Sequence, residues 1–277
     1  MKKEIFKITT IEKEKYNPKY IFKLKEPHIF LHHKLIYDLL VPYNDMRLKR
    51  LIEVLKEQNI LYKIQENTQA KNVVVSLGKS DEPKIVIGAH YDIVDNSFGI
   101  NDNTCSIAML ISLIKELQNK AIDKAVEIVF FDREETGMHG SRLYIEENFN
   151  KIDYAIILDI IGVGDTLVFG TKNESIARKL NSLKLKRSFY ELTSDNLSFK
   201  NNNIPVAIIT AAHMSDMTYL YDNVYQIDNN AKYIQTMHGG LDDNRIEIIN
   251  NLIINDLLTQ LLKLILKNKC SNLFANS

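Results

Sequence analysis

The sequence contains no tryptophan, two cysteines, five prolines and ten glycines among its 277 residues. The two cysteines, Cys105 and Cys270, are far apart and fit neither a disulfide scaffold nor a paired-cysteine zinc motif. A reduced, cytoplasmic compartment is therefore expected. So few glycines and prolines argue against collagen-like and linker-rich architectures.

An excess of charge of either sign is also missing, because 35 basic residues balance 35 acidic ones. Phosphate contacts need clustered positive charge, so we expect no nucleic-acid partner. No apolar run reaches the roughly 18 residues of a membrane span. The best candidate, Leu252–Leu266, is interrupted by polar residues and is typical of an amphipathic helix. The N-terminus has lysines without an apolar run behind them, so we expect neither a secretory signal nor a membrane partner.

The composition itself is that of a globular protein, with 45% apolar and 25% charged residues. A chain of this length can bury a sizeable core. The sequence shows no internal repeat and no linker, so we expect one domain over residues 1–277. Within it, residues 1–25 are expected to form an N-terminal extension and residues 267–277 a frayed polar tail.

Short β-branched or aromatic runs alternate with helical stretches along the chain. In several runs both the odd-numbered and the even-numbered residues are apolar, which is typical of central strands covered on both faces. The alternation predicts an α/β sandwich with a mixed, largely parallel central sheet and helices on both faces. The expected strands are Asn72–Leu77, Lys84–Ala89, Val126–Asp132, Tyr154–Asp159, Thr166–Gly170 and Pro205–Thr210. The expected helices are Asp45–Gln58, with Asp45 as its N-cap, Thr104–Gln118, Ser141–Asn148, Glu174–Leu183 and Asp243–Leu266.

Metal-competent side chains stand at the ends of three expected strands. His90 follows the first, Glu134 and Glu135 come just after the second, and Asp159 ends the third. Parallel α/β sheets place their sites at the carboxyl ends of their strands, so we expect these side chains to converge.

Each of these signals has a simpler interpretation when taken alone. Asp92 lies two residues after His90 and so can orient that imidazole as a neutral ligand, but a hydrogen-bonded histidine would also explain the pair. Asp102 precedes a buried helix, as either its N-cap or a carboxylate shared by two cations. Asp159 needs a partner inside an apolar strand, and a metal is one candidate. His238, beside glycines, is by itself an ordinary loop residue.

The adjacent pair Glu134-Glu135 is more informative. The pair follows an apolar strand and precedes a glycine-containing turn, so a solvated helix face fits poorly. Two crowded carboxylates raise the pKa of one of them unless cations intervene. One glutamate on a metal and one kept free as a general base would use both roles.

Together, the order and spacing of these residues resemble the co-catalytic di-zinc exopeptidases. The closest match is the family of bacterial leucyl-type aminopeptidases, which also contains glutamate carboxypeptidases and glutaminyl cyclases. The resemblance covers roughly Asp45 to Leu266 and implies the zinc-exopeptidase, phosphorylase/hydrolase-like fold. The motifs that carry it are GAHYD at Gly88–Asp92, NDN at Asn101–Asn103, EETGMHGS at Glu134–Ser141 and HGGLD at His238–Asp242.

The resemblance implies two divalent ions, above all Zn²⁺, that share Asp102 and a bridging hydroxide. The other implied ligands are His90 and Asp159 for one ion, and Glu135 and His238 for the other. Histidine and carboxylate ligands suit zinc, although Mn²⁺ or Co²⁺ fit the same set.

The remaining roles follow from the same resemblance. Glu134 is implied as the general base, and Asp92 and Asp242 as outer partners of the ligands. The implied reaction is removal of N-terminal residues from peptides. The side chain that stabilises the oxyanion is left open among Tyr219, Tyr221 and Tyr225.

The chain departs from the family pattern at two positions. Asn196 follows Asp195 where the family usually has a histidine, which puts the substrate side of the site in doubt. Gly239 follows His238 where threonine is frequent.

Two other functions are weighed against the aminopeptidase. A glutaminyl-cyclase-like acyltransferase would use one zinc, but those sites rely on tryptophan, which this chain lacks. A non-catalytic binding module on the same fold would have lost ligands, whereas all five implied ligands and the base are present. The aminopeptidase is therefore the favoured hypothesis.

Overall fold

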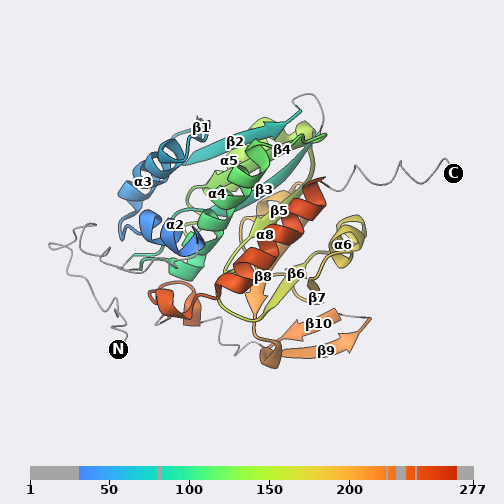
Figure 1. Cartoon of the computed structure of the whole chain (residues 1–277). Helices are drawn as coiled ribbons and strands as arrows, with labels where there is room; N and C mark the ends of the chain where they lie inside the picture. Colours follow the sequence, from blue (N-terminus) through green and yellow to red (C-terminus); the bar gives the residue numbers. More distant parts are fainter. Residues whose placement is uncertain are drawn as a thin grey trace.

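The computed structural model describes residues 31–79, 83–95, 97–222, 224–228, 235–240 and 242–266. The expected extension at 1–25 and tail at 267–277 lie outside these residues. In the described part, ten strands form one sheet in the order β1-β2-β4-β3-β5-β8-β6-β7-β10-β9, with helices packed against it (Figure 1).

The strands and helices alternate along most of the chain. The strands are β1 (Lys63–Glu66), β2 (Lys71–Gly78), β3 (Lys84–His90), β4 (Ala125–Phe131), β5 (Ile152–Leu158), β6 (Thr166–Gly170), β7 (Lys186–Ser188), β8 (Val206–Ala212), β9 (Met217–Tyr221) and β10 (Val224–Ile227). The helices are α2 (Leu31–Leu39), α3 (Asn44–Glu57), α4 (Cys105–Gln118), α5 (His139–Asn148), α6 (Glu174–Asn181), α7 (Asn196–Asn201) and α8 (Asn251–Leu266). A kinked turn at Ile100–Thr104, whose backbone is not helical at Asp102 and Asn103, leads into α4.

The middle of the sheet is parallel, with β4, β3, β5 and β8 side by side. Antiparallel pairs flank this centre, namely β1 with β2, β2 with β4, and β6 with β8. The expected mixed, largely parallel α/β sheet is therefore confirmed.

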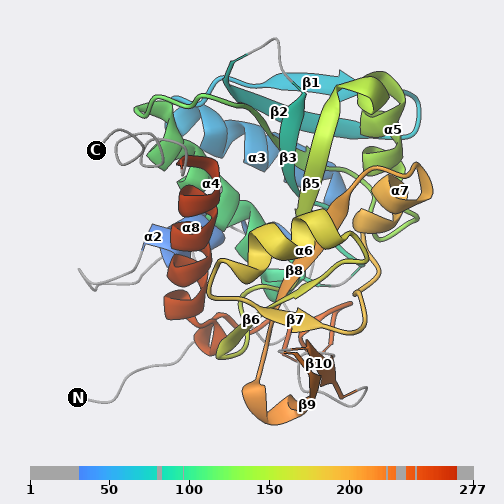
Figure 2. The same ribbon diagram turned by 90° about the vertical axis from the view of Figure 1, so that its right-hand side faces the viewer.

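Successive residues of the central strands feed two cores. Ile85 and Ile87 of β3 pack into the larger core beneath α2, α3, α4 and α8, while Val86 between them packs into the smaller core. Helices α5 and α7 cover that second face (Figure 2). Because both faces of the sheet are covered, the residues that point to either face of these strands are apolar, as the sequence indicates. None of the described helices is long and apolar enough to cross a bilayer.

The predicted start of the last helix is wrong. Helix α8 begins at Asn251 rather than Asp243, because Asp243 and Asn244 bind the segment before α4 and only a short 3₁₀ turn, Ile246–Ile248, comes between. The Asn244 side chain accepts a hydrogen bond from the Phe98 amide at 2.6 Å. The Asn250 side chain then accepts one from the Leu252 amide at 3.1 Å and closes the first turn of α8.

The predicted cap of α3 is also wrong. This helix begins at Asn44, and Tyr43 precedes it without a side-chain capping bond. Asp45 is an exposed residue of the first turn, where its charge favours the helix N-terminus.

Candidate functional site

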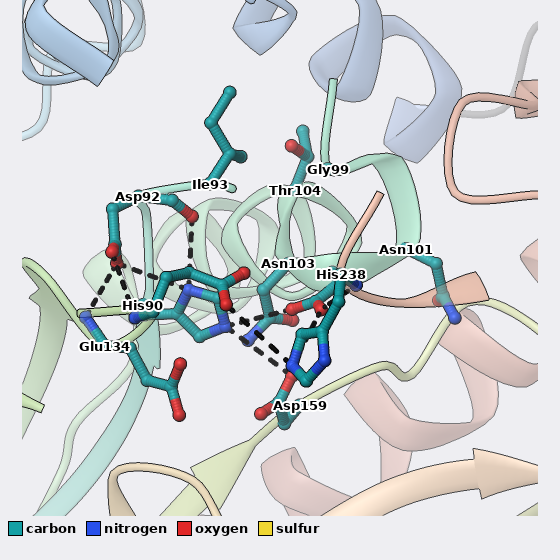
Figure 3. A network of polar contacts seen from close by, with 12 residues as sticks. His90, Asp92, Ile93, Gly99, Asn101, Asn103, Thr104, Glu134, Asp159 and His238 are labelled. Carbon is teal, nitrogen blue, oxygen red and sulfur yellow. Dashed lines mark hydrogen bonds and ion pairs between the residues drawn. The ribbon is translucent and has the colours of Figure 1, made fainter. Parts of the chain in front are cut away.

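The side chains singled out in the sequence meet at the carboxyl end of the parallel strands (Figure 3). His90 is the last residue of β3 and pairs with Phe131, the last of β4. Asp159 directly follows β5, and the segment after β4 carries Glu134 and Glu135. Two further segments, before α4 and before α8, supply Asp102 and His238. The topology therefore brings all six expected site residues into one region.

Three of them form a buried group, which we call the inner trio: His90, Asp102 and Asp159. The Nε2 atom of His90 lies 3.2 Å from Oδ1 of Asp102 and 3.7 Å from Oδ1 of Asp159. One imidazole and two carboxylates therefore face a common point.

A second group, the outer trio, consists of Asp102, Glu135 and His238. The Nε2 atom of His238 lies 3.9 Å from Oδ2 of Asp102 and 3.8 Å from Oε2 of Glu135. Asp102 thus presents one oxygen to each trio. Its Oδ2 atom also accepts a hydrogen bond from the His238 amide at 2.8 Å, which fixes the outer segment to the inner one.

Asp92 ties the imidazole to the two glutamates. Its Oδ1 atom lies 3.4 Å from Nδ1 of His90. The same carboxylate accepts hydrogen bonds from the amides of Glu134 at 2.9 Å and Glu135 at 3.1 Å. Asp92 therefore orients the His90 ring and the Glu134–Glu135 backbone together, the arrangement expected of an outer partner.

The donor set fits divalent metal ions. Nε2 of His90, Oδ1 of Asp159 and Oε1 of Glu135 are buried and make no hydrogen bond within the described part of the chain. Buried polar atoms without a partner are costly, and a cation at the common point of each trio would satisfy them. A set of imidazoles and carboxylates is typical of zinc.

The electrostatics agree with this interpretation. Burial, with the charges of Asp159 and Asp195 adding to it and His90 opposing it, raises the pKa of Glu134 to about 9. Burial likewise raises the pKa of Glu135 to about 8. Burial alone would lower the pKa of His90, but the carboxylates around it hold that pKa well above its usual value. Without cations these groups therefore compete for protons, and cations would replace those protons.

One expected outer partner is displaced by a single position. The Asp242 carboxylate accepts a hydrogen bond from Arg245 at 2.8 Å and is only half-buried. Its neighbour Asp243 is buried and accepts hydrogen bonds from the amides of Asp102 at 3.1 Å and Gly239 at 3.2 Å. Asp243, rather than Asp242, therefore joins the segments that carry Asp102 and His238.

Asp195 is a buried acid that the sequence analysis did not assign. Both of its carboxylate oxygens are buried without a hydrogen bond from any described residue. Burial, with the charges of Asp92 and Asp159 adding to it, raises its pKa to about 7. The next residue, Asn196, accepts a hydrogen bond from the Ser194 amide at 2.9 Å and shapes this turn. The departure from the family's histidine thus has a local structural use.

Two further sequence observations find a place in the structure. Gly239 adopts φ +71°, a left-handed conformation that glycine takes without strain, which suits the turn after His238. Tyr219 and Tyr221 are exposed on β9, and the ring of Tyr225 packs edge-on against Tyr219 at 5.5 Å between centroids. The oxyanion role stays unassigned among the three.

Comparisons with known proteins identify related sequences. Residues 72–245 match the profile described as Peptidase family M28. A vacuolar membrane protease of Debaryomyces hansenii is 27% identical over 121 residues, which is 42% of this chain and 12% of the relative. Leucine aminopeptidase 2 of Trichophyton equinum is 31% identical over 102 residues, 35% of this chain and 21% of the relative. This chain thus spans only a small part of each relative.

Solved structures share the fold over most of the chain. LapA from Legionella has a TM-score of 0.68 at 14% identity, with 86% of this chain and 72% of that one covered. A glutaminyl cyclase from Bacteroides thetaiotaomicron has a TM-score of 0.64 at 16% identity, and the match covers 86% of this chain and 97% of that one. A Zn-dependent exopeptidase from Parabacteroides distasonis has a TM-score of 0.63 at 17% identity, and the match covers 85% of this chain and 96% of that one. At these identities the likeness establishes the architecture alone.

Proposed function

This chain belongs to peptidase family M28, a zinc-dependent exopeptidase family that includes aminopeptidases and glutaminyl cyclases, and we propose that it is an aminopeptidase that binds two zinc ions. The observation that carries the proposal is the pair of trios that share Asp102. A carboxylate with one oxygen toward each of two imidazoles is what a bridged pair of cations requires. Membership of the family and the relatives named aminopeptidases support the same substrate class.

The proposed ligands are those of the two trios: His90, Asp102, Asp159, Glu135 and His238. Zinc bound there would lower the pKa of a water and polarise the carbonyl of the scissile peptide bond.

Glu134 is the proposed general base. Its carboxylate contributes an oxygen to a cluster with His90 and Glu135 in which the ligand atoms all lie within 4.8 Å of one another. Its backbone amide is held by Asp92, so the side chain starts from a fixed position. Glu134 takes the proton of the attacking water and passes it to the leaving amine. Cations bound in the two trios would lower the raised pKa of Glu134 and so free its carboxylate to accept that proton.

A substrate panel tests the proposal directly. Zinc-loaded protein is expected to release free amino acids from aminoacyl anilides and short peptides. Glu134→Gln should lower turnover by roughly 10²–10⁴-fold while leaving the zinc content unchanged, because one general base is worth about that much. Glu146→Gln is the matched control, since Glu146 is exposed on α5. Elemental mass spectrometry after dialysis measures the zinc.

Three results would contradict the proposal. Near-wild-type turnover in Glu134→Gln would remove the assigned base. Cyclisation of N-terminal glutaminyl peptides with release of ammonia, at one zinc per chain, would favour a cyclase. A protein that takes up no zinc would favour a non-catalytic binding module.

The compartment is a separate question. The cytoplasmic location expected from the cysteines stays a prediction, because relatives of this chain include proteins named vacuolar membrane proteases.

A further inference from the structure

Helix α3 carries a buried arginine where its apolar stripe begins. The buried residues of this helix are Arg47, Leu51, Val54 and Leu55, which recur at helical spacing. Arg47 is 4% exposed, although arginine is rarely buried to that extent unless its donors are used. Its position also lies outside residues 72–245, the stretch that defines the family.

The guanidinium of Arg47 donates hydrogen bonds to three residues of the segment 91–104, which follows His90 and contains Asp102. It donates to the backbone oxygen of Tyr91, the residue after His90. It donates to the backbone oxygen of Phe98 at 3.4 Å and to Oγ1 of Thr104 at 2.9 Å, two residues after Asp102. One planar group therefore fixes both ends of this segment.

The first residue of the same helix adds a fourth point. The side chain of Asn44 donates to the backbone oxygen of Ile93 at 2.6 Å and accepts from its amide at 2.9 Å. Ile93 and Thr104 both lie on the side of the ligand network away from Asp159 (Figure 3). Helix α3 thus holds the segment from behind, while the ligand side chains point to the opposite side.

We propose that Arg47 is a positioning residue that sets the distance between His90 and Asp102 and thereby the affinity of the inner trio for zinc. The inference rests on the proposed function. It adds that the metal centre depends on an N-terminal helix outside the family segment. Partners that orient metal ligands typically change metal affinity by about 10–100-fold when they are lost.

The central experiment compares Arg47→Met with Arg50→Met. Arg50 lies one turn further along α3 and bonds to Asp38, Glu53 and Glu57, all within α2 and α3. We expect Arg47→Met to bind zinc about 10–100-fold more weakly in competition with a chromogenic chelator. Arg50→Met should stay within about twofold of wild type.

Two readouts separate positioning from general stability. The absorption spectrum of the cobalt-loaded protein should change in Arg47→Met, because it reports ligand geometry, and stay unchanged in Arg50→Met. In metal-free protein, amides of residues 91–104 should exchange hydrogen faster in Arg47→Met alone. Arg47→Lys keeps the charge but not the planar guanidinium, so its cobalt spectrum and exchange rates should lie between those of Arg47→Met and wild type.

Thr104→Val removes the hydroxyl that accepts one hydrogen bond from Arg47, and it replaces Arg47→Met as the test variant if that protein does not fold. It should weaken zinc binding by a few-fold and shift the cobalt spectrum in the same direction. Wild-type zinc affinity and cobalt spectrum in folded Arg47→Met, or in both Arg47→Lys and Thr104→Val, would overturn this inference and leave the proposed function standing. A wild-type protein that binds no zinc would overturn both.

Discussion

The inner and outer trios share Asp102 but differ in how far water can reach them. The side chains of His90 and Asp159 are 1% and 8% exposed, whereas that of His238 is 61% exposed. The inner trio takes His90 and Asp159 from strand ends, whereas the outer trio takes its histidine from a segment after the sheet. We infer that the inner trio is the high-affinity half of the proposed centre and the outer trio the half that meets substrate. Catalytic zinc sites keep one position open for this purpose.

Removing the shared ligand should collapse both halves. In Asp102→Asn the amide cannot offer a charged oxygen to each trio, so we expect loss of both zinc ions. The affinity should fall by more than the roughly 100-fold that an outer partner costs. Elemental mass spectrometry of dialysed protein measures the loss, and circular dichroism checks folding. Two zinc ions retained in this variant would show that Asp102 does not bridge them.

Removing one histidine at a time should separate the halves. His238→Ala is expected to lose one zinc and keep a tightly held one, because the inner trio is intact. His90→Ala is expected to weaken both ions, since its imidazole and the Asp102 carboxylate are in direct contact. Stepwise titration with a chelator gives the two affinities for each variant. Equal loss in both variants would mean that exposure does not distinguish the trios.

Asp243 joins the segments that carry the two trios, and its neighbour provides a control. Asp243→Asn should weaken zinc binding by about 10–100-fold. The two carboxylate oxygens of Asp243 accept hydrogen bonds from Asp102, Gly239 and Ser97, and a side-chain amide has only one oxygen that can accept. Asp242→Asn should change it little, since Asp242 bonds to Arg245 at the surface. Isothermal titration with zinc measures both. A larger effect at Asp242 would restore the assignment made from sequence.

The smallest expected effect is on stability as a function of pH. In metal-free folded protein burial raises the pKa values of Glu134 and Glu135 to about 9 and about 8, from an ordinary glutamate value of 4.5. The unfolded chain therefore loses these protons first, and stability falls as pH rises from about 5 towards 9. His90 acts in the same direction, because its raised pKa favours the folded state until the pH passes that value.

Calorimetry of metal-free and zinc-loaded protein checks this. We expect the Tm of the metal-free protein to fall by a few degrees between about pH 6 and about pH 8.5. The increase in Tm that zinc produces should grow over the same range, because zinc binding releases protons. A Tm of metal-free protein that rises with pH would contradict the protonation assigned to the two glutamates.

The ligand-bearing core of the fold could be predicted from sequence because its strands bury both faces. Neither face of the run Lys84–His90 points to solvent, and the run ends with His90 at the carboxyl end of its strand. The short strands β7, β10 and β9, which end the sheet on one side, are not among the strands expected from the sequence. They are three to five residues long, and β9 is mostly exposed, so neither length nor alternation marks them.

The residues that hold the ligands in place were harder to find than the ligands. A pattern of adjacent acids at Asp242 and Asp243 does not say which one turns inward, since that depends on the turn at Gly239 and Gly240. Arg47 is polar at an apolar helical position, a signal that becomes meaningful only when its acceptors are known. Ligand chemistry is local in sequence, whereas the geometry around it is set by segments far apart.

The hydrogen bond from the His238 amide to Asp102 spans 136 positions of the chain. Since a ribosome delivers the N-terminal part of a chain first, Asp102 is made well before the segment of His238 and Asp243 that binds it. The outer trio, and the proposed peptidase activity with it, arises only when that segment returns to the sheet. A nascent chain would therefore be inert towards the peptides around it, so that synthesis itself times the onset of proteolysis.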